Sequence, residues 1–142
     1  ARTLFEKAVV ESPDDASIHN DFGYFLYEVG DLESAESQLR RTLKMRPDDR
    51  RCQTNLALTL AAAGRFDESL ELFEQAVGPA AARSNVAVVL AQAGKLRESR
   101  VMLAKARALD PTIAQAKVTQ GWLDGAKVPS EADPAVGKAK VE

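Results

Sequence analysis

The chain has 142 residues, of which 45% are hydrophobic and 28% charged, and its formal net charge is −2. This length and composition fit one compact domain or a short repeat array, and the slightly acidic balance argues against a nucleic-acid partner. Because Cys52 is the single cysteine, an internal disulfide framework and a multi-cysteine metal site are excluded. No apolar run reaches the ~18 residues of a membrane span, so we expect no membrane insertion in this segment.

The first element, Ala1–Asp15, has the pattern of a second helix from a two-helix unit whose first helix lies outside the sequence. Its Phe5, Ala8 and Pro13 have the same mutual spacing as Leu39, Thr42 and Pro47 further on. We therefore expect the natural protein to extend upstream and an apolar edge to be exposed at this end. Each Pro is followed by two Asp residues. Proline ends one helix and the acids can cap the next, so we interpret these segments as turns and not as a metal site.

The segment Asn55–Val77 predicts two amphipathic helices that meet at Gly64. Apolar positions recur with helical spacing on both sides of this glycine: Leu56, Ala57 and Leu60, then Leu70, Phe73 and Val77. We expect Gly64 to take the left-handed conformation that ends the first helix, and Asp67 to cap the second. Neither helix can bury its apolar stripe alone, so this hairpin needs neighbours.

Equivalent hairpins lie upstream and downstream. Gly30, Gly64 and Gly94 open the similar segments GDLESA, GRFDES and GKLRES, at spacings of 34 and 30 residues. Self-similarity at such a period is the signature of a solenoid. The shorter second spacing contains the junction Gly78–Pro79, and we expect the helix before this junction to be shortened by about one turn. This shortening is either a harmless local change or a kink that reshapes the array.

The pattern resembles the tetratricopeptide repeat, in which a small residue and large apolar residues recur in both helices and a Pro follows. In the first unit the pattern positions are occupied by Phe22, Gly23, Leu26, Ala35, Leu39 and Pro47. In the third unit they are occupied by Val86, Ala87, Leu90, Ser99, Leu103, Ala106 and Pro111. The resemblance implies an all-α, right-handed α-solenoid of antiparallel helix pairs. The expected units are a truncated repeat at 1–15, repeats at 16–49, 50–79 and 80–113, a capping helix at 114–126 with Trp122 as its plug, and an extended or disordered tail at 127–142.

The sequence contains little catalytic chemistry. No nucleophile–base set can be assembled, no glycine-rich phosphate loop is present, and neither a cofactor nor a metal is expected. His19, the single histidine, lies where this family often has a tryptophan, so we expect it to pack between helices. Cys52 stands at the start of a helix, where a lowered thiol pKa is conceivable, but a small packing residue is the favoured interpretation. We therefore expect a non-enzymatic protein.

The resemblance also implies a concave groove lined by the first helix of each repeat, called helix A. Carried over by position, the groove residues are Asn20, Asp21, Tyr24, Tyr27 and Glu28; Arg51, Asn55, Leu58 and Ala62; and Ser84, Asn85, Val88 and Gln92. Phe22 and Phe25 fall instead on core positions. Asn55 is the one residue that matches the clamp by which some relatives hold chaperone C-termini, so that function is set aside.

Asn55 and Asn85 occupy equivalent positions on successive A helices. An amide both donates and accepts, so a row of amides can bind a peptide backbone. The alternative is that each asparagine bonds the backbone of the neighbouring repeat. The expected function is a protein- or peptide-binding scaffold, in a setting such as a bacterial assembly or secretion apparatus, cytoplasmic or periplasmic. The alternative is a self-assembly module, a homo-oligomer formed through exposed repeat ends or the C-terminal tail.

Overall fold

The computed structural model describes residues 1–113, 120–121 and 123–125. The predicted plug role of Trp122 and the predicted tail at 127–142 lie outside these residues, as does most of the predicted capping helix. The described part of the chain contains helices and turns and no strand. Its labelled helices are α1 (Arg2–Glu11), α2 (Ala16–Glu28), α3 (Leu32–Met45), α4 (Arg50–Ala62), α5 (Phe66–Val77), α6 (Pro79–Gln92) and α7 (Leu96–Leu109). Residues 120–121 and 123–125 are also helical.

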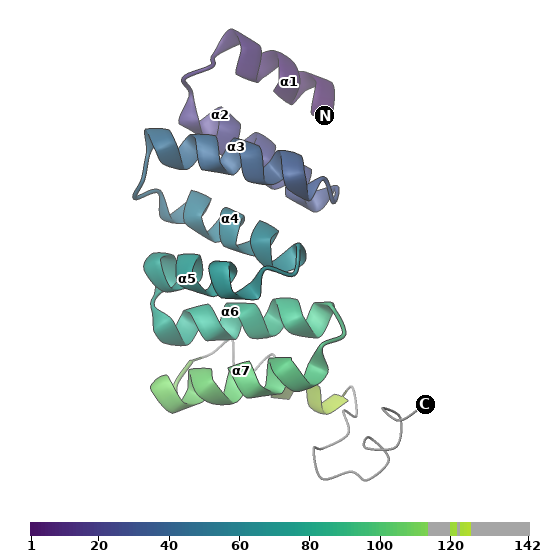
Figure 1. Cartoon of the computed structure of the whole chain (residues 1–142), viewed down its shortest axis with the longest axis vertical. Coiled ribbons are helices and arrows are strands. Elements are labelled where there is room, and N and C mark those ends of the chain that lie inside the picture. Colours follow the sequence, from purple (N-terminus) through teal and green to yellow (C-terminus); the bar gives the residue numbers. More distant parts are fainter. Residues whose placement is uncertain (114–119, 122, 126–142) are drawn as a thin grey trace.

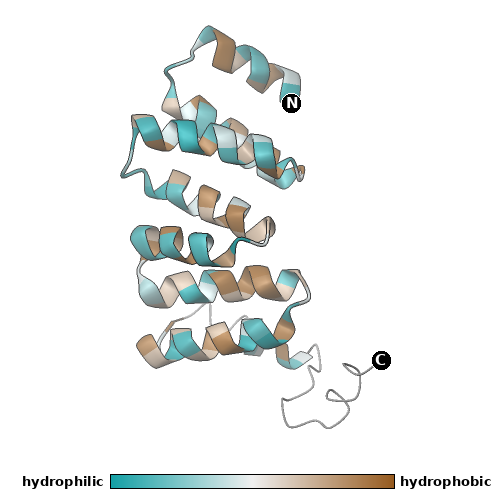
Figure 2. Cartoon of the chain, viewed as in Figure 1, coloured by the Kyte–Doolittle hydropathy of each residue, from teal (hydrophilic) through white to brown (hydrophobic). Residues whose placement is uncertain are grey.

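The helices stack along one axis in chain order (Figure 1), and contacts join each helix to the next from α1 to α7. The pairs α2–α3, α4–α5 and α6–α7 are hairpins, and α4 contacts both α2 and α6. The chain is therefore an α-solenoid, as the sequence predicted. Figure 2 shows α6 as more apolar than α7, which fits the position of α6 between α5 and α7.

The hairpin turns form where the sequence predicted them. Gly30, Gly64 and Gly94 have φ values of 84°, 82° and 77°, a left-handed conformation that side chains other than glycine rarely adopt. The predicted caps are confirmed before two A helices. The Asp15 carboxylate accepts from the backbone N–H groups of Ser17 and Ile18, and the Asp49 carboxylate accepts from that of Cys52.

The predicted cap at Asp67 is wrong. α5 begins at Phe66, and its N-cap residue is Arg65, whose side chain makes no capping hydrogen bond. Asp67 lies inside the first turn, where its charge can only favour the positive end of the helix dipole. Arg65 instead pairs with Glu36 of α3 and Glu68 of α5, at 2.8 and 2.7 Å.

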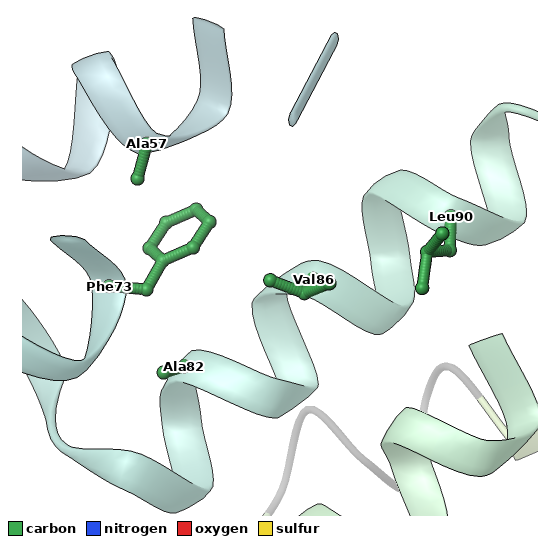
Figure 3. Packing of buried hydrophobic residues seen from close by; sticks show 5 residues of the cluster. All are labelled: Ala57, Phe73, Ala82, Val86 and Leu90. Carbon is green, nitrogen blue, oxygen red and sulfur yellow. The ribbon is translucent and has the colours of Figure 1, made fainter. Parts of the chain in front are cut away.

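The core is built by side chains of each second helix inserted between successive A helices. The ring of Phe73 on α5 extends toward Ala57 of α4 (Figure 3). Phe73 belongs to one core cluster with Ala57 and with Ala82 and Val86 of α6, and its side chain is fully buried. Small residues let the helices of one hairpin approach closely. The buried Ser69 hydroxyl donates to the carbonyl of Ala57 at 2.7 Å, which satisfies a polar group that would otherwise be costly to bury.

The short spacing between the second and third hairpins arises mostly in the turn. α5 has 12 residues and α3 has 14, so the second helix is shortened by two residues rather than by a full turn. Between α3 and α4 stand residues 46–49, whereas Gly78 alone, with φ 85°, separates α5 from α6. Pro79 begins α6, where its fixed φ and missing N–H are tolerated.

Candidate ligand-binding groove

Three A helices provide one continuous surface. α4 contacts α2 on one side and α6 on the other, so we name the surface that α2, α4 and α6 share the A-helix face. A pocket of about 260 Å³ opens on it. The residues that line this pocket come from four helices: Tyr27, Thr54, Leu58, Phe73, Asn85, Val88, Val89 and Gln92.

The pocket contains five of the residues predicted for the groove, namely Tyr27, Leu58, Asn85, Val88 and Gln92. Sequence reasoning missed Thr54, Val89 and Phe73. Phe73 belongs to a second helix, and Val89 is 7% exposed, so both had the pattern of core residues. Thr54 directly precedes Asn55 in the sequence, and its helical position beside a groove residue was the available signal.

Three polar side chains of the pocket form no hydrogen bond with other described residues. The side chains of Thr54, Asn85 and Gln92 are half-buried or exposed, and none of them makes a hydrogen bond within the described residues. The lining residues carry no charge. The pocket therefore combines apolar walls with neutral groups that can donate to or accept from a main-chain amide.

Asn20 and Asn55, both predicted for the groove, do not line the pocket. They are 3% and 7% exposed, and the Asn55 Nδ2 donates to the Asn20 Oδ1 at 3.0 Å. The bond joins α2 to α4 through two side chains, not through the backbone bond proposed as the alternative. Ser84 is also buried, and its hydroxyl has no hydrogen-bond partner among the described residues. These three predicted groove residues therefore lie mainly inside the helix packing.

The charged and aromatic groove positions gather at the α2 end of the A-helix face. The Arg51 guanidinium donates to the Asp21 carboxylate at 2.7 Å. The rings of Tyr24 and Tyr27 are 5.9 Å apart. The charge of the neighbouring Glu28 and a hydrogen bond to it raise the pKa of Tyr24. Ala62, at the equivalent position to Glu28 on α4, is exposed and neutral.

The predicted core positions of Phe22 and Phe25 are confirmed. Phe22 is buried and Phe25 is half-buried, and both rings lie close to that of Phe5 from α1, with centroids 5.3 and 5.4 Å away. This cluster attaches α1 to the first hairpin. It separates Phe22 and Phe25 from the exposed Tyr24 on the same helix, as the helical spacing predicted.

His19 and Cys52 are packing residues. The buried His19 ring contacts the Gln38 Oε1 at 2.7 Å and, through Nε2, the Pro13 carbonyl at 2.9 Å. The suggestion that the thiol pKa of Cys52 is lowered is wrong. Burial, reinforced by the charge of Asp49, raises this pKa to about 12. Its thiol donates to the Leu39 carbonyl at 3.2 Å. Desolvation outweighs any effect of the helix N-terminus at this position.

No group of three or more His, Cys, Asp or Glu side chains in the described ranges is placed to hold a metal ion. Among the helices that the structure describes, none is long and apolar enough to cross a bilayer.

A solenoid of helical hairpins with an open face is the architecture of a protein-interaction scaffold. Residues 20–86 match the family model for the tetratricopeptide repeat. Together with the fold, this match confirms, for residues 20–86, the resemblance to the tetratricopeptide repeat predicted from the sequence. A comparison with curated protein sequences finds no match.

Several solved structures have the same fold. One MamA structure is 24% identical with a TM-score of 0.59, and the match covers 78% of this chain and 66% of that chain. A second MamA structure is 13% identical with a TM-score of 0.61, covering 89% and 76%. YrrB, described as a TPR protein with an unusual peptide-binding site, is 19% identical with a TM-score of 0.58, covering 89% and 68%. The chain thus spans about two thirds to three quarters of these proteins.

Proposed function

We propose that this chain is a non-catalytic scaffold that binds an extended segment of a partner protein across α2, α4 and α6. The observation that carries the proposal is the pocket between α4 and α6, in which apolar walls adjoin polar side chains that have no hydrogen-bond partner among the described residues. An extended peptide has an unpaired N–H and C=O at nearly every residue, and neutral amides can bind either group. The setting we expect is a multiprotein assembly, for example a bacterial assembly or secretion apparatus.

The amide of Asn85 is the main polar group in this proposal. Asn55, its equivalent on α4, already donates to Asn20. Asn85 lies in the pocket, and no hydrogen bond holds its side chain within the described residues. We therefore assign backbone recognition to Asn85, supported by Gln92 on the same helix.

The test uses peptides selected from a displayed random library with the wild-type chain as bait. Val88→Arg places a long charged side chain at the pocket, and Val101→Arg is the matched control, because Val101 is an exposed residue of α7 that does not line the pocket. We expect the selected peptides to bind wild type and Val101→Arg equally and to lose binding to Val88→Arg. Circular dichroism checks that both variants are folded. Equal binding to all three proteins would refute the groove proposal.

A specific observation favours self-association as a second function. Leu4 and Val10 on α1 are 73% and 78% exposed, and large apolar side chains exposed to this extent are candidates for a contact between copies. Light scattering over a concentration series tests this. A mass that rises with concentration in wild type, but not in a Leu4→Ser, Val10→Ser variant, would support self-association. A constant monomer mass in wild type would exclude it.

A further inference from the structure

We infer that the segment bound in the groove carries one apolar side chain for the pocket and a lysine or arginine about four residues away, over the α2 end of the A-helix face. This inference rests on the proposed function and adds the chemistry of the ligand. It follows from three features of the described residues: the lining of the pocket, the unbalanced charge on α2, and the distance between them.

The pocket selects a neutral, apolar group. Its walls include Leu58, Val88 and Val89, with the ring of Phe73 behind them, and no lining residue is charged. An engineered apolar cavity of about 150 Å³ holds benzene, so a pocket of about 260 Å³ can accept a branched aliphatic or aromatic side chain. A charged side chain would lose hydration here without gaining an ion pair.

The α2 end of the face selects a positive charge. Among the predicted groove positions the charged residues are Asp21, Glu28 and Arg51, and Asp21 and Arg51 neutralise one another at 2.7 Å. Glu28 is exposed and forms no ion pair within the described residues. The positions equivalent to Glu28 on α4 and α6 are Ala62 and Gln92. One uncompensated carboxylate therefore remains on the face, and a cationic side chain complements it.

The spacing between the two features follows from helix and strand geometry. Packed helices are about 8–10 Å apart. Leu58 and Val88 place the centre of the pocket between α4 and α6, and Tyr27 of α2 lies at its edge. The axis of α2 is therefore about one and a half helix spacings from that centre, roughly 12–15 Å. An extended segment rises about 3.3 Å per residue. The apolar anchor and the basic residue are thus expected to be about four positions apart.

The experiment compares library selections with three baits: wild type, Glu28→Gln, and Glu71→Gln as the matched control. Glu71 is an exposed glutamate of α5 with no ion pair within the described residues. Wild type and Glu71→Gln should enrich peptides with an apolar residue and a Lys or Arg about four positions away, in either order. Glu28→Gln should keep the apolar preference and lose the basic one.

Binding measurements on one selected peptide complete the test. Replacing its basic residue by glutamine should weaken binding to wild type by about 2- to 5-fold at low ionic strength, as expected for an exposed ion pair, and should not change binding to Glu28→Gln. An unchanged basic preference with Glu28→Gln, or none with wild type, would overturn the inference while leaving the groove proposal intact. Peptides that bind Val88→Arg as well as wild type, or a selection that yields none, would overturn both.

Discussion

Replacing Asn55 by alanine should destabilise the protein, whereas the same replacement at Asn85 should mainly weaken peptide binding. The two asparagines are equivalent in the repeat, but their surroundings differ. Asn55 is 7% exposed and donates to the buried Oδ1 of Asn20 at 3.0 Å. Asn85 is half-buried in the pocket without a hydrogen bond inside the described residues.

The magnitudes follow from these contacts. Asn55→Ala leaves the Asn20 carbonyl oxygen buried without its donor from α4, which costs about 1–3 kcal/mol. For a chain of this size, that loss lowers the thermal midpoint by roughly 4–12 °C. Asn85→Ala removes no hydrogen bond between described residues, so its effect on stability should stay within about 0.5 kcal/mol. It removes one hydrogen bond to a bound peptide, worth about 1 kcal/mol or about fivefold in Kd.

Urea unfolding followed by circular dichroism measures the stabilities, and fluorescence anisotropy with a selected peptide measures binding. A double-mutant cycle with Asn20→Ala isolates the bond, because removing both partners leaves no orphaned carbonyl. The combined variant should therefore lose less stability than the sum of the single variants. Strict additivity, or an Asn55→Ala variant as stable as wild type, would refute the assignment of Asn55 to the fold.

Three further predictions test the core. Phe73→Ala should cost ~3–5 kcal/mol in urea unfolding, since the ring is fully buried between α4 and α6; an unchanged midpoint would contradict this packing. Gly23→Ala should cost ~1–3 kcal/mol by the same assay, because a Cβ there would lie 2.6 Å from the Cγ of the buried Leu39; wild-type stability would mean that Leu39 moves aside. Burial raises the pKa of the Cys52 thiol from its ordinary value of 9.0 to about 12. The thiol therefore ionises more readily in the unfolded chain, and the free energy of unfolding should fall as the pH rises above about 9. A disulfide reagent at pH 8 should accordingly label Cys52 only after urea is added, and rapid labelling of the folded protein would refute its burial.

The fold was predictable because each hairpin has local sequence signals for its turn and for its apolar face. A glycine ends each A helix in the left-handed region, and apolar side chains at helical spacing face the neighbouring helices. Asp67 shows where this reasoning failed. Asp31 follows Gly30 directly and caps α3, but Arg65 and Lys95 follow Gly64 and Gly94. The aligned repeats already placed a basic residue at the cap position, so Asp67 stood two residues too late.

The equivalent repeat positions of Asn55 and Asn85 did not predict that Asn55 would bond within the fold while Asn85 lies in the pocket. Asn55 donates to Asn20, and the residue equivalent to Asn20 on α4 is Thr54. The threonine side chain is shorter than that of asparagine, and Thr54 forms no hydrogen bond with Asn85 as Asn20 does with Asn55. A difference in side-chain reach at one position therefore leaves the amide of the next helix available to a ligand.

The pocket itself forms where the repeats stop being alike. The position of Tyr24 on α2 is occupied by Leu58 on α4 and by Val88 on α6, so the side chains on the A-helix face become smaller along the stack. Tyr27 has alanine equivalents, and its ring extends to the edge of the pocket. The large α2 residues and the small α6 residues together leave an apolar space with charge at one end only. A repeat array of identical units would present the same surface at every step, whereas this gradient would give the proposed peptide segment a defined position along the face.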